Sequence, residues 1–138
     1  MRTTIASMKR ILVLALFVAS TLTFTKTLTA QETITPIMSH TLAEASSSEV
    51  LMYTVDFPPG FASPIHRHDA QVSVYVLEGT VVMQVKGGKE LTLGPGQSFY
   101  ENPDDIHVVS RNASNSKPAK FLVFLIHKKD APLVIPVP

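Results

Sequence analysis

The chain has 138 residues and no cysteine, which excludes disulfides, zinc–thiolate and iron–sulfur sites, a cysteine nucleophile and a lipid-bearing cysteine. Its length suits one domain, and its 45% hydrophobic and 17% charged residues are typical of a folded protein. The formal net charge is +1, but Arg2, Lys9, Arg10 and Lys26 all stand in the first thirty residues, which hold no acid. The remainder has eight basic against eleven acidic residues, so we expect no basic surface for nucleic acid.

Residues 1–30 have the three parts of an export signal. Residues 2–10 carry three cations, residues 11–18 are apolar without a break, and the small residue Ala30 precedes the first acid. An apolar stretch of about 14 residues is shorter than the roughly 20 that a membrane-spanning helix needs. We therefore predict a signal peptide over 1–30 rather than a membrane anchor. The mature chain would be periplasmic or secreted, with no membrane association once the signal is removed.

The rest of the chain reads as short β-rich segments separated by turn residues. The expected strands cover 50–57, 72–77, 80–85, 89–93, 97–101, 106–111 and 121–127. Gly87-Gly88 lies between two of them and predicts a hairpin. No segment after residue 31 has a helical period. Short strands at regular spacing predict an all-β sandwich or barrel over 50–127, with an N-terminal arm at 31–49 and an extended C-terminal tail at 128–138.

Three histidines form a candidate metal site. His66 and His68 stand two apart in an extended segment, so their side chains share one face. Two imidazoles on one face can hold a metal ion if a third ligand comes from elsewhere in the fold. His107 begins a later strand, directly after a turn rich in proline and aspartate. Such a position is typical of the mouth of a barrel.

The segments around these histidines resemble the two motifs of the cupin superfamily. The matching positions are Gly60, His66, His68 and Gly79 in the first motif and Gly96 and His107 in the second. The resemblance covers about residues 50–127. It implies a cupin-type double-sheet jelly-roll β-barrel. It also implies a metal inside the barrel, held by two histidines and an acid of the first motif and the histidine of the second.

The sequence departs from the cupin motifs most at the acid. Val72 stands in its place, and Gln71 beside it is a residue type that serves as ligand in some cupins. Alternation along the strand turns Gln71 to the opposite face, so it reaches the metal only if a bulge shifts the face. Without a carboxylate, three neutral imidazoles favour zinc, iron, nickel or copper over manganese. We predict one divalent transition metal on His66, His68 and His107, with Gln71 as fourth ligand.

Two smaller departures concern turn geometry. Asn102 replaces the usual proline before the second-motif histidine, and the asparagine that follows this histidine comes one residue late, at Asn112. Asn112-Ala-Ser114 also matches the glycosylation acceptor pattern, which occurs often by chance.

The site residues indicate two classes of function. Glu101 lies near the expected barrel mouth, where it is either a general acid or base or a solvated rim residue. The first class is a small metal-dependent enzyme of oxygenase, lyase or isomerase type acting on an oxygen-rich small molecule. The alternative is a module that binds or senses a small ligand or a metal without turnover, and a scaffold role stays open. The edge strands of such a fold favour a homodimer.

Overall fold

The computed structural model describes residues 30–43 and 45–138, so the predicted signal peptide, apart from Ala30, lies outside the described residues. This part of the chain is all-β, and it contains no helix long and apolar enough to cross a membrane. Its strands are β1 (Thr33–Leu42), β2 (Ala45–Phe57), β3 (His66–Arg67), β4 (Ala70–Glu78), β5 (Val81–Val85), β6 (Leu91–Leu93), β7 (Ser98–Glu101), β8 (Ile106–Asn112), β9 (Ala119–Lys128) and β10 (Ile135–Pro136).

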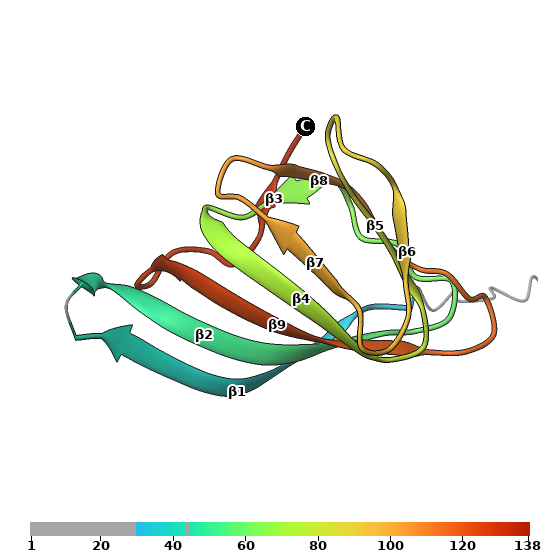
Figure 1. Ribbon diagram of the computed structural model, residues 1–138, viewed down its shortest axis with the longest axis horizontal. Helices are drawn as coiled ribbons and strands as arrows, with labels where there is room; N and C mark the ends of the chain where they lie inside the picture. The colour runs from blue at the N-terminus through green and yellow to red at the C-terminus, as the bar shows by residue number, and fades with distance from the viewer. Residues whose placement is uncertain (1–29, 44) are drawn as a thin grey trace, which may run out of the picture.

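The strands form two antiparallel sheets. One has the order β1-β2-β9-β4-β7 and the other the order β10-β3-β8-β5-β6. Figure 1 shows the first sheet as a long curved layer whose strands β1, β2 and β9 extend beyond the second sheet. This arrangement confirms the predicted all-β class and is consistent with a jelly roll, whereas closure of the sheets into a barrel stays a prediction.

All seven predicted strands are present, as β2 and β4 to β9. The segment expected as an N-terminal arm holds β1 and the start of β2, which begins at Ala45 because its backbone pairs with β1 on one side and β9 on the other. The segment expected as an extended tail holds β10, which pairs with β3 through Ile135–Arg67 and Pro136–His66. Both terminal segments therefore belong to the sheets.

The core lies between the sheets and follows from alternation along the strands. In β4, Val72, Val74 and Val76 are buried while the residues between them are exposed. Apolar side chains of the other strands pack against this row, and the core cluster comprises Tyr53, Val55, Phe57, Ala70, Val72, Val74, Val76, Val81, Met83, Leu93, Phe99, Ala119, Phe121, Val123 and Leu125. Branched and aromatic side chains on one face of each strand hold the two layers together.

The glycine that ends the first cupin-like motif is required by the packing. Gly79 has a φ of +70°, and a Cβ there would lie 2.5 Å from the carbonyl oxygen of Pro118 and 2.8 Å from the Cα of Ala119. Only glycine fits a left-handed backbone this close to another chain segment. Gly79 thus lets β4 turn into β5 against the start of β9, which brings the second sheet over the first.

Candidate metal site

The three predicted histidines converge between the sheets. His66 lies on β3, directly opposite His107 of β8 in the register of these two strands. His68 follows two residues after His66, and the ring centroids of the two lie 5.0 Å apart. All three are buried, and one ligand atom from each lies within 4.8 Å of the others. The fold therefore gathers three imidazoles from two segments about forty residues apart.

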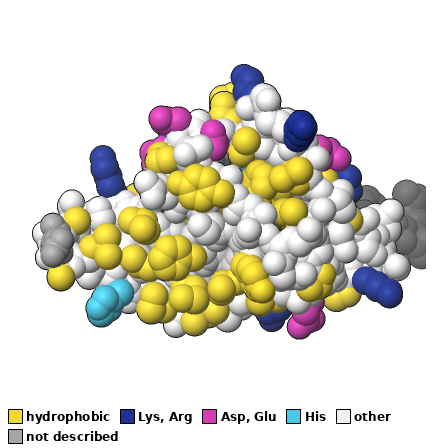
Figure 2. Space-filling view, in the orientation of Figure 1, with side chains coloured by type: hydrophobic (Ala, Val, Ile, Leu, Met, Phe, Trp, Pro, Cys, Tyr) yellow, Lys and Arg dark blue, Asp and Glu magenta, His cyan; other side chains and the backbone are white. Residues whose placement is uncertain are grey.

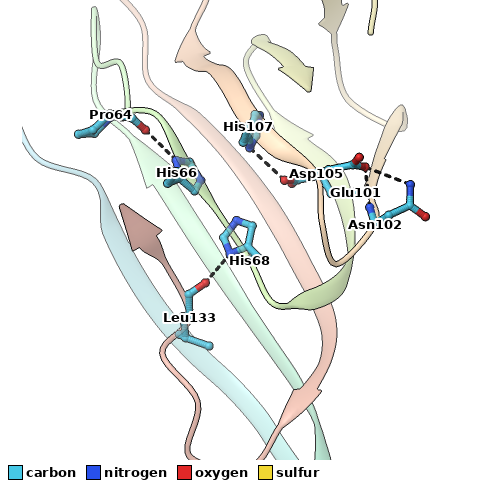
Figure 3. Close-up of polar contacts among 8 residues, drawn as sticks. All are labelled: Pro64, His66, His68, Glu101, Asn102, Asp105, His107 and Leu133. Carbon is cyan, nitrogen blue, oxygen red and sulfur yellow. Dashed lines mark hydrogen bonds and ion pairs between the residues drawn. The ribbon is translucent and has the colours of Figure 1, made fainter. Parts of the chain in front are cut away.

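Backbone carbonyl groups determine which nitrogen of His66 and His68 is free. The Nδ1 atom of His66 is 2.7 Å from the carbonyl oxygen of Pro64, and the Nδ1 atom of His68 bonds the carbonyl oxygen of Leu133 (Figure 3). A carbonyl oxygen only accepts hydrogen bonds, so each Nδ1 donates its proton. Each Nε2 then keeps a lone pair, and an outer hydrogen bond of this kind is the usual support of a metal-binding histidine.

His107 has one buried ring nitrogen whose hydrogen-bonding capacity no described residue satisfies. Its Nε2 has no hydrogen-bond partner in the described part of the chain, and its Nδ1 lies 3.3 Å from Oε2 of Glu101. The ring of Phe99 stacks on the imidazole at 5.6 Å between centroids. Burial, together with the neighbouring His66 and His68, lowers the pKa of His107 to about 3, and burial also lowers the pKa of His68. Neutral imidazoles and an orphaned buried nitrogen fit a bound transition metal.

Glu101 brings a carboxyl group into the site from a neighbouring strand. It lies on β7, is 2% exposed, and stands directly opposite Val72 of β4. Burial raises its pKa to about 7, with a further contribution from Asp105. Val72 occupies the position of the motif acid, and the carboxyl group of Glu101, 29 residues later in the sequence, lies opposite it. The solvated-rim interpretation of Glu101 is wrong, because the side chain lies inside.

Gln71 is not brought to the histidines. Its side chain is exposed between the buried residues Ala70 and Val72. The pairing of β4 with β9 runs without a shift from Ala70 to Val76, so the bulge that Gln71 would need is not there. Strict alternation keeps Gln71 on the outer face of the sheet. Its predicted role as fourth ligand has no support in this geometry.

A cavity of about 150 Å³ adjoins the three imidazoles. Besides the histidines and Glu101 it is lined by Tyr53, by Glu32 at the N-terminal end and by Val134 and Pro136 of the C-terminal segment. Sequence reasoning missed these residues. Tyr53 could have been found, since it is in phase with Val55 and Phe57 on a predicted strand. The terminal residues carry no local signal, because only the sheet pairing brings them here.

Asn112 has a structural role. Its side-chain Nδ2 donates to the carbonyl oxygens of Phe57, Pro58 and Lys117, and its Oδ1 accepts from the backbone N–H of Ser114. The residue is 3% exposed. A buried amide with all these bonds ties the end of β8 to the end of β2, so the folded protein does not offer this glycosylation pattern to solvent.

Two antiparallel sheets that enclose three convergent histidines define the class of double-sheet β proteins with a buried histidine site. The Cupin_2 cupin domain family matches residues 53–125, which is more than half of the chain, so this protein belongs to the cupins. That match confirms the resemblance of the two motifs. Among curated proteins none matches the chain.

Solved structures of similar fold include enzymes. The DMSP lyase DddQ from Ruegeria pomeroyi DSS-3 is 25% identical with a TM-score of 0.57, over 67% of this chain and 45% of the lyase. The protein TT1209 from Thermus thermophilus is 29% identical with a TM-score of 0.55, over 69% and 82% of the two chains. An oxalate oxidase in complex with glycolate is 20% identical with a TM-score of 0.58, over 78% and 61%. This chain thus spans less than half of the DMSP lyase.

Proposed function

We propose that this protein is an exported single-domain cupin that holds one divalent transition metal on His66, His68 and His107 and acts as an enzyme on a small oxygen-bearing molecule. The observation that carries the proposal is the buried Nε2 of His107, which has no partner among the described residues and belongs to a group of three close imidazoles. An unsatisfied buried polar atom costs about 1–3 kcal/mol. A metal ion bound by this nitrogen would remove that cost.

The histidines are proposed to bind the metal, and Glu101 is proposed to transfer a proton. Three neutral imidazoles suit zinc, iron, nickel or copper better than manganese. Such a metal would supply a Lewis acid that polarises an oxygen atom of the substrate. Glu101 lines the same cavity and is the candidate general acid or base, because its carboxyl faces the space beside the histidines. The hydroxyl of Tyr53 lines this space too and can donate a hydrogen bond, since burial and the nearby acids raise its pKa.

Oxygenase, lyase and isomerase chemistry all fit a single open metal site. The DMSP lyase among the similar structures supports lyase chemistry. The oxalate oxidase, at 20% identity, supports the fold alone.

A binding or sensing module without turnover is the second candidate. Val72 favours it, because an apolar side chain occupies the place of the motif's carboxylate ligand. Metal loading without turnover of any acid, enol or hydroxy compound would favour this candidate.

Metal analysis of the mature chain tests the proposal. We expect about one transition metal per chain, and a loss of affinity of more than about 100-fold in His66→Ala and His107→Ala, beyond the effect of removing an outer-sphere partner. Gln71→Ala is the matched control on the outer face of β4 and should bind as the parent does. Calorimetric titration with zinc measures all three variants. Unchanged affinity in His66→Ala would refute the three-histidine site.

The proposal of export depends on the basic and apolar segment over residues 2–18. Expression of the full chain in a Gram-negative host should yield mature protein in the periplasmic or extracellular fraction. N-terminal sequencing is expected to find a start near residue 31, and a start at Met1 in exported material would contradict the signal peptide.

A further inference from the structure

The cavity beside the histidines has a polar end, and most of its other lining residues are apolar. The imidazoles, Glu101 and Glu32 form the polar end, and Tyr53, Ser63 and Ser110 add hydroxyl groups to the lining, whereas Val55, Phe57, Met83 and Phe121 are among the apolar lining residues. Ile34, Ile65 and Val134 also line it and are 41%, 46% and 42% exposed, so these side chains border its opening. A molecule that enters therefore passes apolar side chains before it meets the histidines.

The charges of the lining are one-sided. None of the described residues that line the cavity is a lysine or arginine, whereas Glu32 and Glu101 are both acids. The Glu32 carboxyl lies near His66 and Ser63, and burial raises its pKa. Because both acids lie beside the histidines, a negatively charged group at the other end of the cavity would meet mainly hydrocarbon, with no lysine or arginine among the described lining residues to compensate its lost hydration. Only the imidazole end, when a metal is bound there, offers positive charge.

The volume limits the size of the ligand. A cavity of about 150 Å³ is the size that holds benzene in an engineered apolar protein cavity, which corresponds to roughly six non-hydrogen atoms. Larger ligands would have to protrude past Ile34 and Val134 into solvent.

We infer that the site takes a small molecule with a single oxygen-bearing group directed at the histidines and an apolar remainder, such as a short monocarboxylic acid or enol. A second anionic group at the far end is selected against. This inference deepens the proposed function and rests on it for the orientation of the ligand, but the selection by charge is a property of the cavity walls. The sequence predicts an oxygen-rich substrate, and the cavity restricts this class to molecules that carry oxygen at one end only.

Butyrate and succinate test the inference, because these four-carbon acids differ in one terminal carboxylate. We would titrate the mature protein with each acid, metal-free and loaded with zinc, and follow the methyl resonances of Met83 and Val123 by NMR. Butyrate is expected to shift both and to bind at least about tenfold more tightly than succinate, a difference of about 1.4 kcal/mol. Equal or tighter binding of succinate overturns the inference, and so does a failure of both acids to shift these methyl groups in either form.

A pair of lysine variants shows whether the missing cation is the cause. Ile34→Lys places a cation at the opening and should raise succinate affinity about tenfold while butyrate binding stays within about twofold. Leu91→Lys is the matched control, because Leu91 is also 41% exposed but lies outside the cavity lining. Unchanged succinate binding in Ile34→Lys would contradict the inference. If zinc fails to bind, the proposed metal function fails, while the ranking of the two acids in metal-free protein still decides the inference.

Discussion

At the scale of single residues, the contact between Glu101 and His107 is the most informative. Both side chains are almost fully buried and lie 3.3 Å apart, and burial drives each toward its neutral form. The carboxyl therefore keeps its proton, and the imidazole loses its extra proton, over most of the acidic range. A neutral pair costs less to bury than an ion pair, which explains how a carboxyl can stand in an apolar layer.

Glu101 should make the stability of the metal-free protein fall as the pH rises. The pKa of its carboxyl is about 7 in the folded chain against an ordinary value of 4.5, so the folded state binds more protons between these values. Stability from this group is present below pH 4.5 and is lost as the pH rises through 7. Glu101→Gln should remove this loss. Between pH 4 and pH 8 the free energy of unfolding of the variant should therefore rise by about 3 kcal/mol relative to that of the parent. Urea unfolding at several pH values measures it.

The lowered pKa of His107 acts in the opposite sense and is shared by parent and variant. Its stability contribution is present above pH 6.5 and is lost as the pH falls toward about 3. The difference between the two unfolding curves therefore isolates Glu101. Parallel curves over the whole range would show that its carboxyl is not perturbed by burial.

At the scale of elements, the turn from β4 to β5 depends on Gly79. A Cβ there meets the backbone of Pro118 and Ala119, whereas Gly87, with a φ of +81°, has nothing within 4 Å of the same atom. Gly87→Ala should cost about 1 kcal/mol from the positive φ alone. Gly79→Ala adds the clash and should cost at least about 3 kcal/mol. Thermal unfolding of the two variants measures the difference, and equal losses would show that the segments at Gly79 can separate freely.

The C-terminal segment adjoins the candidate metal site through β10. Leu133 accepts the hydrogen bond that orients His68, and Pro136 pairs with His66. Deletion of residues 133–138 should lower zinc affinity about 10- to 100-fold, as loss of an outer-sphere partner does. Deletion of residues 137–138 alone keeps both contacts and should change the affinity by less than about threefold. Circular dichroism confirms that the shortened chains fold, and calorimetry gives the affinities. Equal affinity in all three chains would separate the tail from the site.

At the scale of the whole molecule, β1 is an edge strand that can pair with a strand of another molecule. The order of the sheet puts the ten-residue β1 at its edge, and Ile34, Ile37 and Met38 of this strand are exposed. Figure 2 shows hydrophobic side chains gathered along this side of the molecule, over the region of β1 and β2. Long apolar edges of this kind pair readily with another strand.

We expect two copies to associate along β1. Light scattering of the mature protein should give the mass of a dimer. Ile37→Lys introduces a charge at a side chain that is 55% exposed on this edge and should shift the mass to that of a monomer. Leu91→Lys, on the other sheet, is the control and should leave the dimer intact. A monomeric parent protein would remove this expectation.

The sequence by itself determined the all-β class, the seven central strands and the three histidines, because each depends on local signals. Alternating apolar residues mark a strand, glycines and prolines mark its ends, and the spacing of His66 and His68 puts both on one face. The same alternation correctly indicated that Gln71 faces away. Each of these features depends on residues that lie close together in the sequence.

Only the tertiary structure decided which groups surround the histidines. Glu101 meets Val72 through the pairing of β7 with β4, and Leu133 meets His68 because β10 pairs with β3. The members of these two contacts are 29 and 65 positions apart, and no local pattern in the sequence indicates that they meet. Register between distant strands depends on burying one face of each sheet against the other, which is a property of the whole fold. This chain lacks the acid of the cupin motif at Val72, and the carboxyl of Glu101 was found beside that position only after the strands were paired.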